Sequence, residues 1–375
     1  MIDFWSYKKE YKKYKKDILK SIDNTLIKGN IFFGDELLKF EKNFTKKYNY
    51  KYGLAVKSCT DALYISLKVL GVKKGDEVIT AANTAIPTIS AIILAGATPK
   101  LVDISSDYLI NVNHIKKSIT SKTKAIIPVH LYGQSCDMPK ILKIAKKYKL
   151  KIIEDCAQAQ GAKFKNKHVG NFGDFGCFSF YPTKILGAYG DGGFIVTNNR
   201  KFFEKAKRIR FYGIETEVKK NSFINQYYAN EFGINSRMDE IQSSILNFKL
   251  NKVDQFIKKR RKLAKLYFNY LSNTDLILPR ENDFCKHAYH LFTVRHKKAK
   301  KIIKILKRKG VNSRIIYQYP IHKMKAFKIY NFNQSKLNIS EKISKEIFSL
   351  PLYPELTSIN VKKICKILMN ILNNC

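Results

Sequence analysis

Two ionisable side chains, Asp155 and Lys184, stand in sequence surroundings that are suited to chemistry. Asp155 lies at the end of the apolar run in "LKIIEDCA", and Lys184 follows 29 positions later in "SFYPTKILGAYGDGG". A lysine amine can bond covalently to a carbonyl carbon and, once released, can transfer protons. Taken singly, each residue has a plainer interpretation, because a carboxylate at a strand end is commonly a cap and most lysines are solvated surface groups.

One cofactor, pyridoxal phosphate, requires both of these groups. It forms a Schiff base with a lysine amine, and a carboxylate beside its pyridine nitrogen keeps that nitrogen protonated, so that the ring withdraws electrons from a carbanion. Lys184 and Asp155 could supply these two functions. The sequence therefore predicts pyridoxal 5'-phosphate as cofactor, with Lys184 as the catalytic residue and Asp155 as a cofactor ligand.

The phosphate of such a cofactor needs hydroxyl groups and backbone amides at the start of a helix. The stretch "VKSCTDALYISL" offers Ser58, Cys59 and Thr60 before a helix-like run, and Ser179 precedes Lys184. Ser58 and Thr60 alone would be read as ordinary helix caps. Together with Asp155 and Lys184, they predict a phosphate-binding turn.

The segments that must position these residues alternate between short apolar runs and helix-like patterns. This alternation predicts an α/β domain with a mostly parallel sheet, in which functional groups gather at strand ends. Helix-like patterns cover residues 60–71 and 137–149. The expected strands are residues 52–58, 76–82, 98–104, 123–131, 150–157 and 192–198.

A change of pattern near residue 250 predicts a second, smaller domain. Residues 233–272 read as one long helical stretch, and the runs that follow alternate again between strand-like and helical patterns. We therefore expect a large cofactor-binding domain over residues 1–250 and a smaller α/β domain over residues 251–375.

Composition narrows the classes of function and location. The formal net charge is +40, but the lysines are spread along all 375 residues and no nucleic-acid-binding motif is present, so we expect no nucleic-acid partner. No apolar run approaches the roughly 20 residues of a membrane span, and the N-terminus lacks a secretory pattern, which predicts a cytoplasmic protein without membrane contact. Seven scattered cysteines without a CxxC pair predict neither disulfides nor a metal site.

Beyond these separate signals, the chain resembles the DegT/DnrJ/EryC1/StrS family of pyridoxal-phosphate-dependent nucleotide-sugar aminotransferases. The similarity runs in family order from about Gly34 to Leu356. It implies an aspartate aminotransferase-like fold (type I), with a seven-stranded type of sheet, and a homodimer with shared active sites. The matching stretches include "SCTDALYISLKVLGV", "GDEVITAANTAIPTISAI", "IIEDCAQAQGA", "GDFGCFSFYPTKILGAYGDGG", "GINSRMDEIQSSIL" and "HAYHLFTVR".

The resemblance also implies roles for single residues. Lys184 matches the Schiff-base lysine and Asp155 the partner of the pyridine nitrogen, while Gln158 matches a contact to the cofactor ring. Ser179 and the Cys59/Thr60 turn match phosphate contacts, and Asn235 matches an asparagine that reaches the phosphate in the neighbouring subunit. The chain departs from the family pattern at three positions, which are Cys59 in place of glycine, Gln160 in place of histidine and Ala85 in place of an aromatic residue.

A lysine at position 184 implies transamination, since family members with histidine there are dehydratases. The implied reaction moves an amino group from L-glutamate, by way of pyridoxamine 5'-phosphate, to a keto-sugar. The run "NSRMDE" resembles enzymes that aminate C3 of dTDP-linked 3-keto-6-deoxyhexoses, which implies a dTDP-3-amino-3,6-dideoxyhexose for surface glycans. Tyr317 and His322 match a region near the sugar nucleotide, and Tyr181 is a third candidate substrate contact.

Two other functions stay open at this point. One is amination at C4 of a nucleotide-linked 4-keto-6-deoxy sugar, and the other is a regulatory protein that binds pyridoxal phosphate without turnover.

Overall fold

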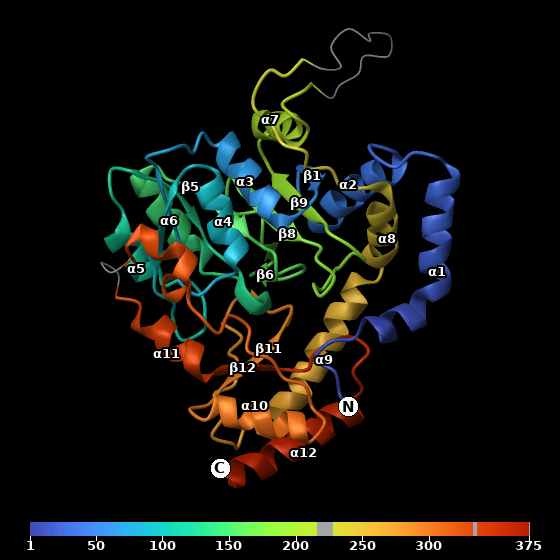
Figure 1. Ribbon diagram of the computed structural model, residues 1–375, viewed down its shortest axis with the longest axis vertical. Helices are drawn as coiled ribbons and strands as arrows, with labels where there is room; N and C mark the ends of the chain where they lie inside the picture. The colour runs from blue at the N-terminus through green and yellow to red at the C-terminus, as the bar shows by residue number, and fades with distance from the viewer. Residues whose placement is uncertain (216–227, 333–335, 375) are drawn as a thin grey trace.

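The computed structural model describes residues 1–215, 228–332 and 336–374, and a seven-stranded sheet lies at its centre (Figure 1). The strand order is β1-β9-β8-β5-β4-β2-β3, and β9 pairs antiparallel with both neighbours while the other pairs are parallel. The strands are β1 (Tyr52–Val56), β2 (Glu77–Ala81), β3 (Thr98–Val102), β4 (Thr123–Ile127), β5 (Lys151–Asp155), β8 (Phe175–Ser179) and β9 (Gly193–Thr197).

Helices cover both faces of this sheet, because its strands carry apolar residues on both sides. In β9, for example, Phe194 and Val196 belong to one hydrophobic cluster, and Ile195 between them belongs to the cluster on the opposite face. Side chains alternate along a strand, so a sheet of this kind must be covered twice. The helices before residue 251 are α1 (Tyr7–Ile27), α2 (Asp35–Tyr48), α3 (Cys59–Val69), α4 (Ile86–Leu94), α5 (Val112–Ser118), α6 (Met138–Tyr148), α7 (Arg200–Arg210) and α8 (Glu240–Leu250).

All six expected strands are present in the central sheet, which contains one more strand that the sequence pattern did not indicate. This strand, β8, is buried at every position but contains Gly176, and a glycine inside a short apolar run weakens the strand signal. The structure needs the glycine, since a Cβ atom there would lie 2.5 Å from the Cα atom of Gly170.

The expectation of one long helix over residues 233–272 is wrong. Helix α8 ends at Leu250, and α9 (Val253–Leu271) begins after a turn at Asn251 and Lys252. The two helices serve different partners, because α8 packs on α1 and α2 whereas α9 packs on α12 (Ser358–Asn373). A single straight helix could not make both sets of contacts.

The C-terminal part of the chain builds its own hydrophobic cluster around a two-stranded sheet. Ile2 joins this cluster and pairs with Val311, so the chain begins beside the C-terminal segment, as Figure 1 shows. The boundary near residue 250 stays a prediction. The elements here are β11 (Phe292–Arg295), β12 (Ile347–Leu350), α10 (Ala299–Arg308), α11 (Asn338–Glu346) and α12.

Smaller elements complete the structure. Strands β6 (Lys163–Phe164), β7 (Lys167–His168) and β10 (Cys285–Lys286) form a three-stranded sheet. Short 3-10 helices cover Leu131–Gly133, Ile321–Lys323 and Lys325–Tyr330. Among the described residues, no helix is long and apolar enough to cross a membrane.

Candidate active site

Most of the predicted cofactor residues lie at one edge of the central sheet. Strands β1 and β8 both run antiparallel to β9, so the ends of β1, β5 and β8 lie at the same edge as the start of β9. Asp155 ends β5, Ser179 ends β8 opposite Gly193, and Ser58 follows the end of β1. The topology thus brings together side chains that are 121 residues apart in sequence, from Ser58 to Ser179.

Lys184 lines a cavity of about 600 Å³ between the sheet edge and the C-terminal part of the chain. Desolvation lowers the pKa of the Lys184 amine, although the nearby carboxylate of Asp155 acts in the opposite direction. The loop that carries Lys184 is held by the hydrogen bond from its own amide to the carbonyl oxygen of Tyr181, at 2.8 Å. A neutral lysine amine can bond to a carbonyl carbon and accept a proton.

Asp155 is buried, with 4% of its surface exposed, and each of its carboxylate oxygens accepts a hydrogen bond. The Thr88 hydroxyl donates to Oδ2 at 2.8 Å, and the Ala157 amide donates to Oδ1 at 3.1 Å. Burial raises the pKa of Asp155, while these two hydrogen bonds and the charge of Lys184 oppose the rise. A buried carboxylate of this kind is suited to a cationic partner.

Gln158 lies between two tyrosines at the wall of the same cavity. Its side-chain oxygen accepts from the amide of Tyr132 at 2.8 Å, and its nitrogen donates to the hydroxyl of Tyr317 at 2.7 Å. The rings of Tyr132 and Tyr317 are nearly parallel, with centroids 6.4 Å apart. These bonds fix the orientation of the Gln158 amide and link it to the C-terminal part of the chain.

The turn before α3 has the geometry of an anion-binding helix start. Ser58 is the N-cap and accepts from the amide of Asp61 at 3.1 Å, while the first amides of the helix, from Cys59 and Thr60, have no acceptor within it. Gly193 allows the strand to approach this turn, because a Cβ atom there would lie 2.3 Å from the carbonyl carbon of Ser58. Asp61 also accepts from the hydroxyl of Ser236 at 2.7 Å, and this bond links the turn to the segment before α8.

Gln160 and Ser179 support the site from the protein interior. The Gln160 side chain is fully buried and donates to the carbonyl oxygen of Ser179, and the hydroxyl of Ser179 accepts from the amide of Tyr181 at 3.2 Å. Gln160, which stands where histidine is frequent in the family, therefore holds the Ser179 backbone in this chain.

These residues fit pyridoxal phosphate at three separate points. The cavity presents an amine with a lowered pKa, the end of β5 presents a buried carboxylate, and the α3 turn presents free amides. The donor set thus provides for the aldehyde, the pyridine nitrogen and the phosphate of one molecule.

The chain matches the DegT/DnrJ/EryC1/StrS aminotransferase family over residues 12–369. It belongs to this family. Members of the family are pyridoxal-phosphate-dependent sugar aminotransferases, and the chain is therefore an enzyme of this kind.

Relatives with assigned names agree with this assignment over almost the whole chain. A "dTDP-3-amino-3,6-dideoxy-alpha-D-galactopyranose transaminase" from Aneurinibacillus thermoaerophilus is 41% identical and covers 97% of this chain and 98% of its own length. A "dTDP-3-amino-3,4,6-trideoxy-alpha-D-glucose transaminase" from Micromonospora megalomicea subsp. nigra is 38% identical, with 94% of each chain covered. The crystal structure of S. venezuelae DesV is 30% identical with a TM-score of 0.93, and 99% of this chain and 98% of that chain are covered. The expected fold class is confirmed.

The three remaining candidate residues lie at different places relative to the cavity. Asn235 is exposed, and its side-chain oxygen accepts from Nε of Arg237 at 3.1 Å. His322 does not line the cavity, and its Nε2 lies 3.0 Å from Glu341 on α11. Tyr181 does line the cavity, with 54% of its surface exposed.

The last two residues of the run "NSRMDE", Asp239 and Glu240, stabilise the fold. Asp239 caps α8 by accepting from the amide of Gln242 at 2.7 Å. Glu240 is buried and accepts from amides at the start of α2, including that of Gly34 at 2.9 Å. Asn235 is the exposed member of this run in the sugar aminotransferase, whereas Arg237 and Asp239 are half-buried.

Several cavity residues were not indicated by the sequence. Arg260 on α9 donates to three backbone carbonyls, and burial lowers its pKa to about 10. His290 is buried with an unpartnered Nδ1, and burial together with the charges of Lys184 and Arg260 lowers its pKa. Further lining residues are Asp3, Phe4 and Trp5 from the N-terminus, together with Lys307 and Arg314. They come from segments far apart in the chain, and a single sequence gives no signal that they meet.

The residue before Asp155 supports the site from the opposite side of the sheet. Glu154 is fully buried and lies with His130 and Cys156 in a group whose polar atoms are within 4.8 Å of one another. In His130 and Glu154 the atoms that could bind a metal already make hydrogen bonds, so we assign the group a structural function. Glu154 bonds to His130 and accepts from the amides of Gly170, Phe172 and Gly173, and His130 also accepts from the amide of Cys136.

Proposed function

We propose that this enzyme moves an amino group from L-glutamate to C3 of a dTDP-linked 3-keto-6-deoxyhexose and makes a dTDP-3-amino-3,6-dideoxyhexose for surface glycans. The observation that carries the proposal is the Lys184 cavity, where an amine with a lowered pKa lies near a buried carboxylate. The two relatives described above are both named for dTDP-3-amino sugars, which supports C3 as the position of amination.

Lys184 has two tasks in this proposal. Bound pyridoxal phosphate supplies an electron sink that makes the proton on the neighbouring carbon acidic. Lys184 holds the cofactor covalently between turnovers and, when released, moves that proton between the carbons of cofactor and substrate. Its lowered pKa favours the neutral amine that this task needs.

The other cofactor residues bind and orient. Asp155 pairs with the protonated pyridine nitrogen, and Gln158, held by Tyr132 and Tyr317, contacts the ring. Ser58, Cys59, Thr60 and Ser179 bind the phosphate at the start of α3. A side chain at Cys59 leaves its amide free to donate, so the departure from glycine is compatible with this role.

The open side of the cavity offers positive charge for the nucleotide diphosphate. Lys307 and Arg314 are exposed at its wall, and no carboxylate partner for either is present among the described residues. Tyr181 and Tyr317 are placed to contact the sugar. We keep His322 as a candidate substrate ligand, although Glu341 holds its Nε2 in the present structure.

The active sites are proposed to be shared in a homodimer. Asn235 is exposed and forms a backbone bridge with Phe211, and its side chain, which accepts from Arg237, lies where a second chain could reach it. In this arrangement the asparagine of one subunit binds the phosphate in the site of the other.

The reaction is tested by incubating the purified holoenzyme with L-glutamate and separate dTDP-linked 3-keto and 4-keto sugars, followed by NMR of the product. A nitrogen at C3 is expected. A product aminated at C4 would instead identify a C4 aminotransferase, and the absence of turnover with either sugar would argue for different substrates. Borohydride treatment followed by peptide mapping should place the cofactor on Lys184, independently of the sugar.

A further inference from the structure

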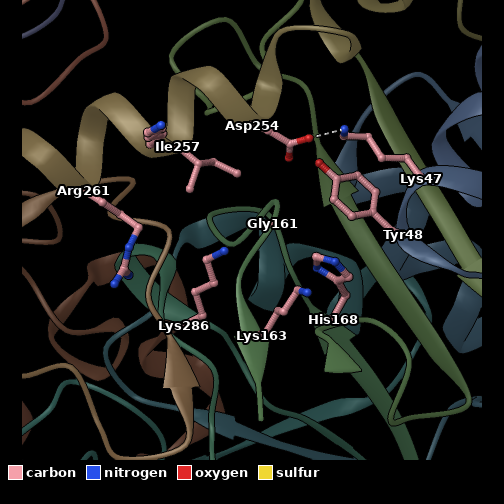
Figure 2. Close-up of a pocket in the computed structure, with 10 residues that line it drawn as sticks. Lys47, Tyr48, Gly161, Lys163, His168, Asp254, Ile257, Arg261 and Lys286 are labelled. Atoms are coloured by element: carbon pink, nitrogen blue, oxygen red, sulfur yellow. Dashed lines mark hydrogen bonds and ion pairs between the residues drawn. The ribbon is translucent and has the colours of Figure 1, made fainter. Parts of the chain in front are cut away.

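A second cavity, of about 540 Å³, is lined by residues of α2, α9 and the small sheet (Figure 2). The end of α2, the small sheet of β6, β7 and β10, and the first half of α9 form its walls. The two cavities have no lining residue in common. Residues of this second cavity take no part in the function proposed above.

Five cationic side chains and one carboxylate line this second cavity. Lys47 lies 2.6 Å from Asp254, and Arg261 lies 2.8 Å from Glu281, so two of the cations are already paired. The other three are Lys163 on β6, Lys258 on α9 and Lys286 on β10. Within residues 1–215, 228–332 and 336–374, none of these three has an ion pair or a side-chain hydrogen bond.

The hydroxyl of Tyr48 is a second, independent indication of a ligand. Only 3% of this residue is exposed, and its hydroxyl oxygen is buried without a hydrogen-bond partner in the described chain. Figure 2 shows that the side chain projects into the cavity towards Asp254. An unpaired buried hydroxyl costs free energy, which a ligand with an acceptor atom would recover.

His168 adds a titratable group to the same wall. Desolvation and the charges of Lys163 and Lys286 lower its pKa to about 4, so the imidazole is neutral at neutral pH. Asp254 acts weakly in the opposite direction, and the ring of Tyr48 packs edge-on at 4.9 Å. Burial, and after it the positive charges of Lys163 and Lys286, therefore keep His168 in its neutral form.

We propose that this second cavity is a binding site for a small anion with two or more negative charges carried on phosphate groups. Lys163, Lys258 and Lys286 would neutralise the phosphates, and the hydroxyl of Tyr48 would donate to a phosphate oxygen. Lysine suits this task because its ammonium group binds phosphate as a point charge without demanding one geometry.

Gly161, which lines the second cavity, lets the chain pass close to α9. Gly161 has a φ of +78°, and a Cβ atom there would collide with Ile257 of α9. The chain turns here only three residues after Gln158, which lines the other cavity. A larger residue here would be strained by the positive φ and would require the Ile257 side chain to move.

The proposal is tested by calorimetric titration of the holoenzyme with inorganic pyrophosphate at constant ionic strength. The double variant Lys163→Gln/Lys258→Gln should bind pyrophosphate at least about tenfold more weakly, because two charge-assisted contacts are lost. Lys262→Gln removes one exposed charge from the same helix outside the cavity, and this control should bind like the wild type. Tyr48→Phe keeps the ring packing and should also weaken binding.

Further titrations identify the phosphate compound that binds and test whether it binds in this cavity. Inorganic phosphate, glucose 1-phosphate and a nucleoside diphosphate are titrated in the same way, and the tightest binder indicates which phosphate compound the cavity accepts. Binding of pyrophosphate should raise the pKa of His168 above about 4 in an NMR titration, since an anion favours the imidazolium. Equal binding by the double variant, or loss of binding in Arg314→Gln alone, would overturn the proposal, because the anion would then bind elsewhere.

Discussion

Thr88 donates its hydroxyl proton to Oδ2 of Asp155 at 2.8 Å, and this bond joins the first turn of α4 to the end of β5. The bond favours the ionised carboxylate, whereas burial favours the neutral acid, and burial dominates because the pKa of Asp155 is raised. A positive charge beside Asp155 would oppose this rise in pKa and favour the ionised carboxylate. The pyridinium nitrogen of the cofactor would supply that charge.

Asp155→Asn should lower the rate of transamination by at least about 100-fold, because an amide cannot keep the pyridine nitrogen protonated. Thr88→Val should lower the rate by about tenfold, since one hydrogen bond to the carboxylate is lost. Thr88→Ser keeps the hydroxyl and is the matched control. The measurement is the rate at which glutamate changes the absorbance of the bound cofactor. An Asp155→Asn enzyme with nearly normal rates would show that Asp155 has no such role.

Sequence patterns predicted Asp155 but not Thr88, and the reason is physical. A carboxylate at the end of an apolar strand is a local feature, whereas the contact with Thr88 depends on how β2 and β5 are ordered in the sheet. Arg260 and His290 were missed for the same reason, since α9 and the segment before β11 reach the cavity only after the chain has folded. Local patterns were sufficient for six of the seven central strands. They failed at β8, where a glycine meets another backbone segment, and at Asn251, where the helix is interrupted because its two halves pack on different partners.

The lowered pKa of Lys184 should be visible in the cofactor-free protein. The pKa of Lys184 is about 10.5 in the unfolded chain and lower in the folded protein. At pH values between these two pKa values, the folded state binds fewer protons than the unfolded state. The free energy of unfolding should therefore rise with pH through that window. Lys184→Met should remove this part of the rise, as measured by urea denaturation at a series of pH values. Asp155→Asn should lower the pKa of Lys184 further, because Asp155 is the main opposing charge. An unchanged pH profile in Lys184→Met would contradict the assignment.

Helix α1 is fixed to the loop after Lys184 by a buried ion pair. Lys249 Nζ lies 2.6 Å from Oε1 of Glu10 and 2.5 Å from the carbonyl oxygen of Gly187. Glu10→Ala should lower the free energy of unfolding by about 3 kcal/mol, because it leaves the Lys249 charge buried without its partner. The control Asp17→Ala removes an exposed carboxylate from the same helix and should change stability by less than about 0.5 kcal/mol.

A double variant separates the cost of the unpaired charge from the loss of the pair itself. Glu10→Leu/Lys249→Met replaces both charges by apolar groups and should recover most of the stability that Glu10→Ala loses. If Glu10→Ala and Asp17→Ala were equally stable in denaturant titrations, the ion pair would not anchor the helix.

The shared active site can be tested by mixing two inactive chains. Asn235 is exposed in a single chain, so its effect on catalysis should require a partner. When Lys184→Ala chains are re-associated with Asn235→Ala chains, one site of each heterodimer receives both lesions and the other receives neither. Activity should return to about half of the wild-type value per heterodimer, because a two-fold dimer completes one intact site.

This test needs an Asn235→Ala homodimer that is itself nearly inactive. Asn230→Ala is the matched control, since it removes an exposed amide nearby and should stay active alone. Mass spectrometry of the mixture verifies that heterodimers have formed. An asparagine that acted within its own chain would leave both sites of the heterodimer inactive, because one lacks Lys184 and the other lacks Asn235. Recovery therefore requires that the two residues of each working site come from different subunits, and the absence of recovery would show that Asn235 acts only within its own chain.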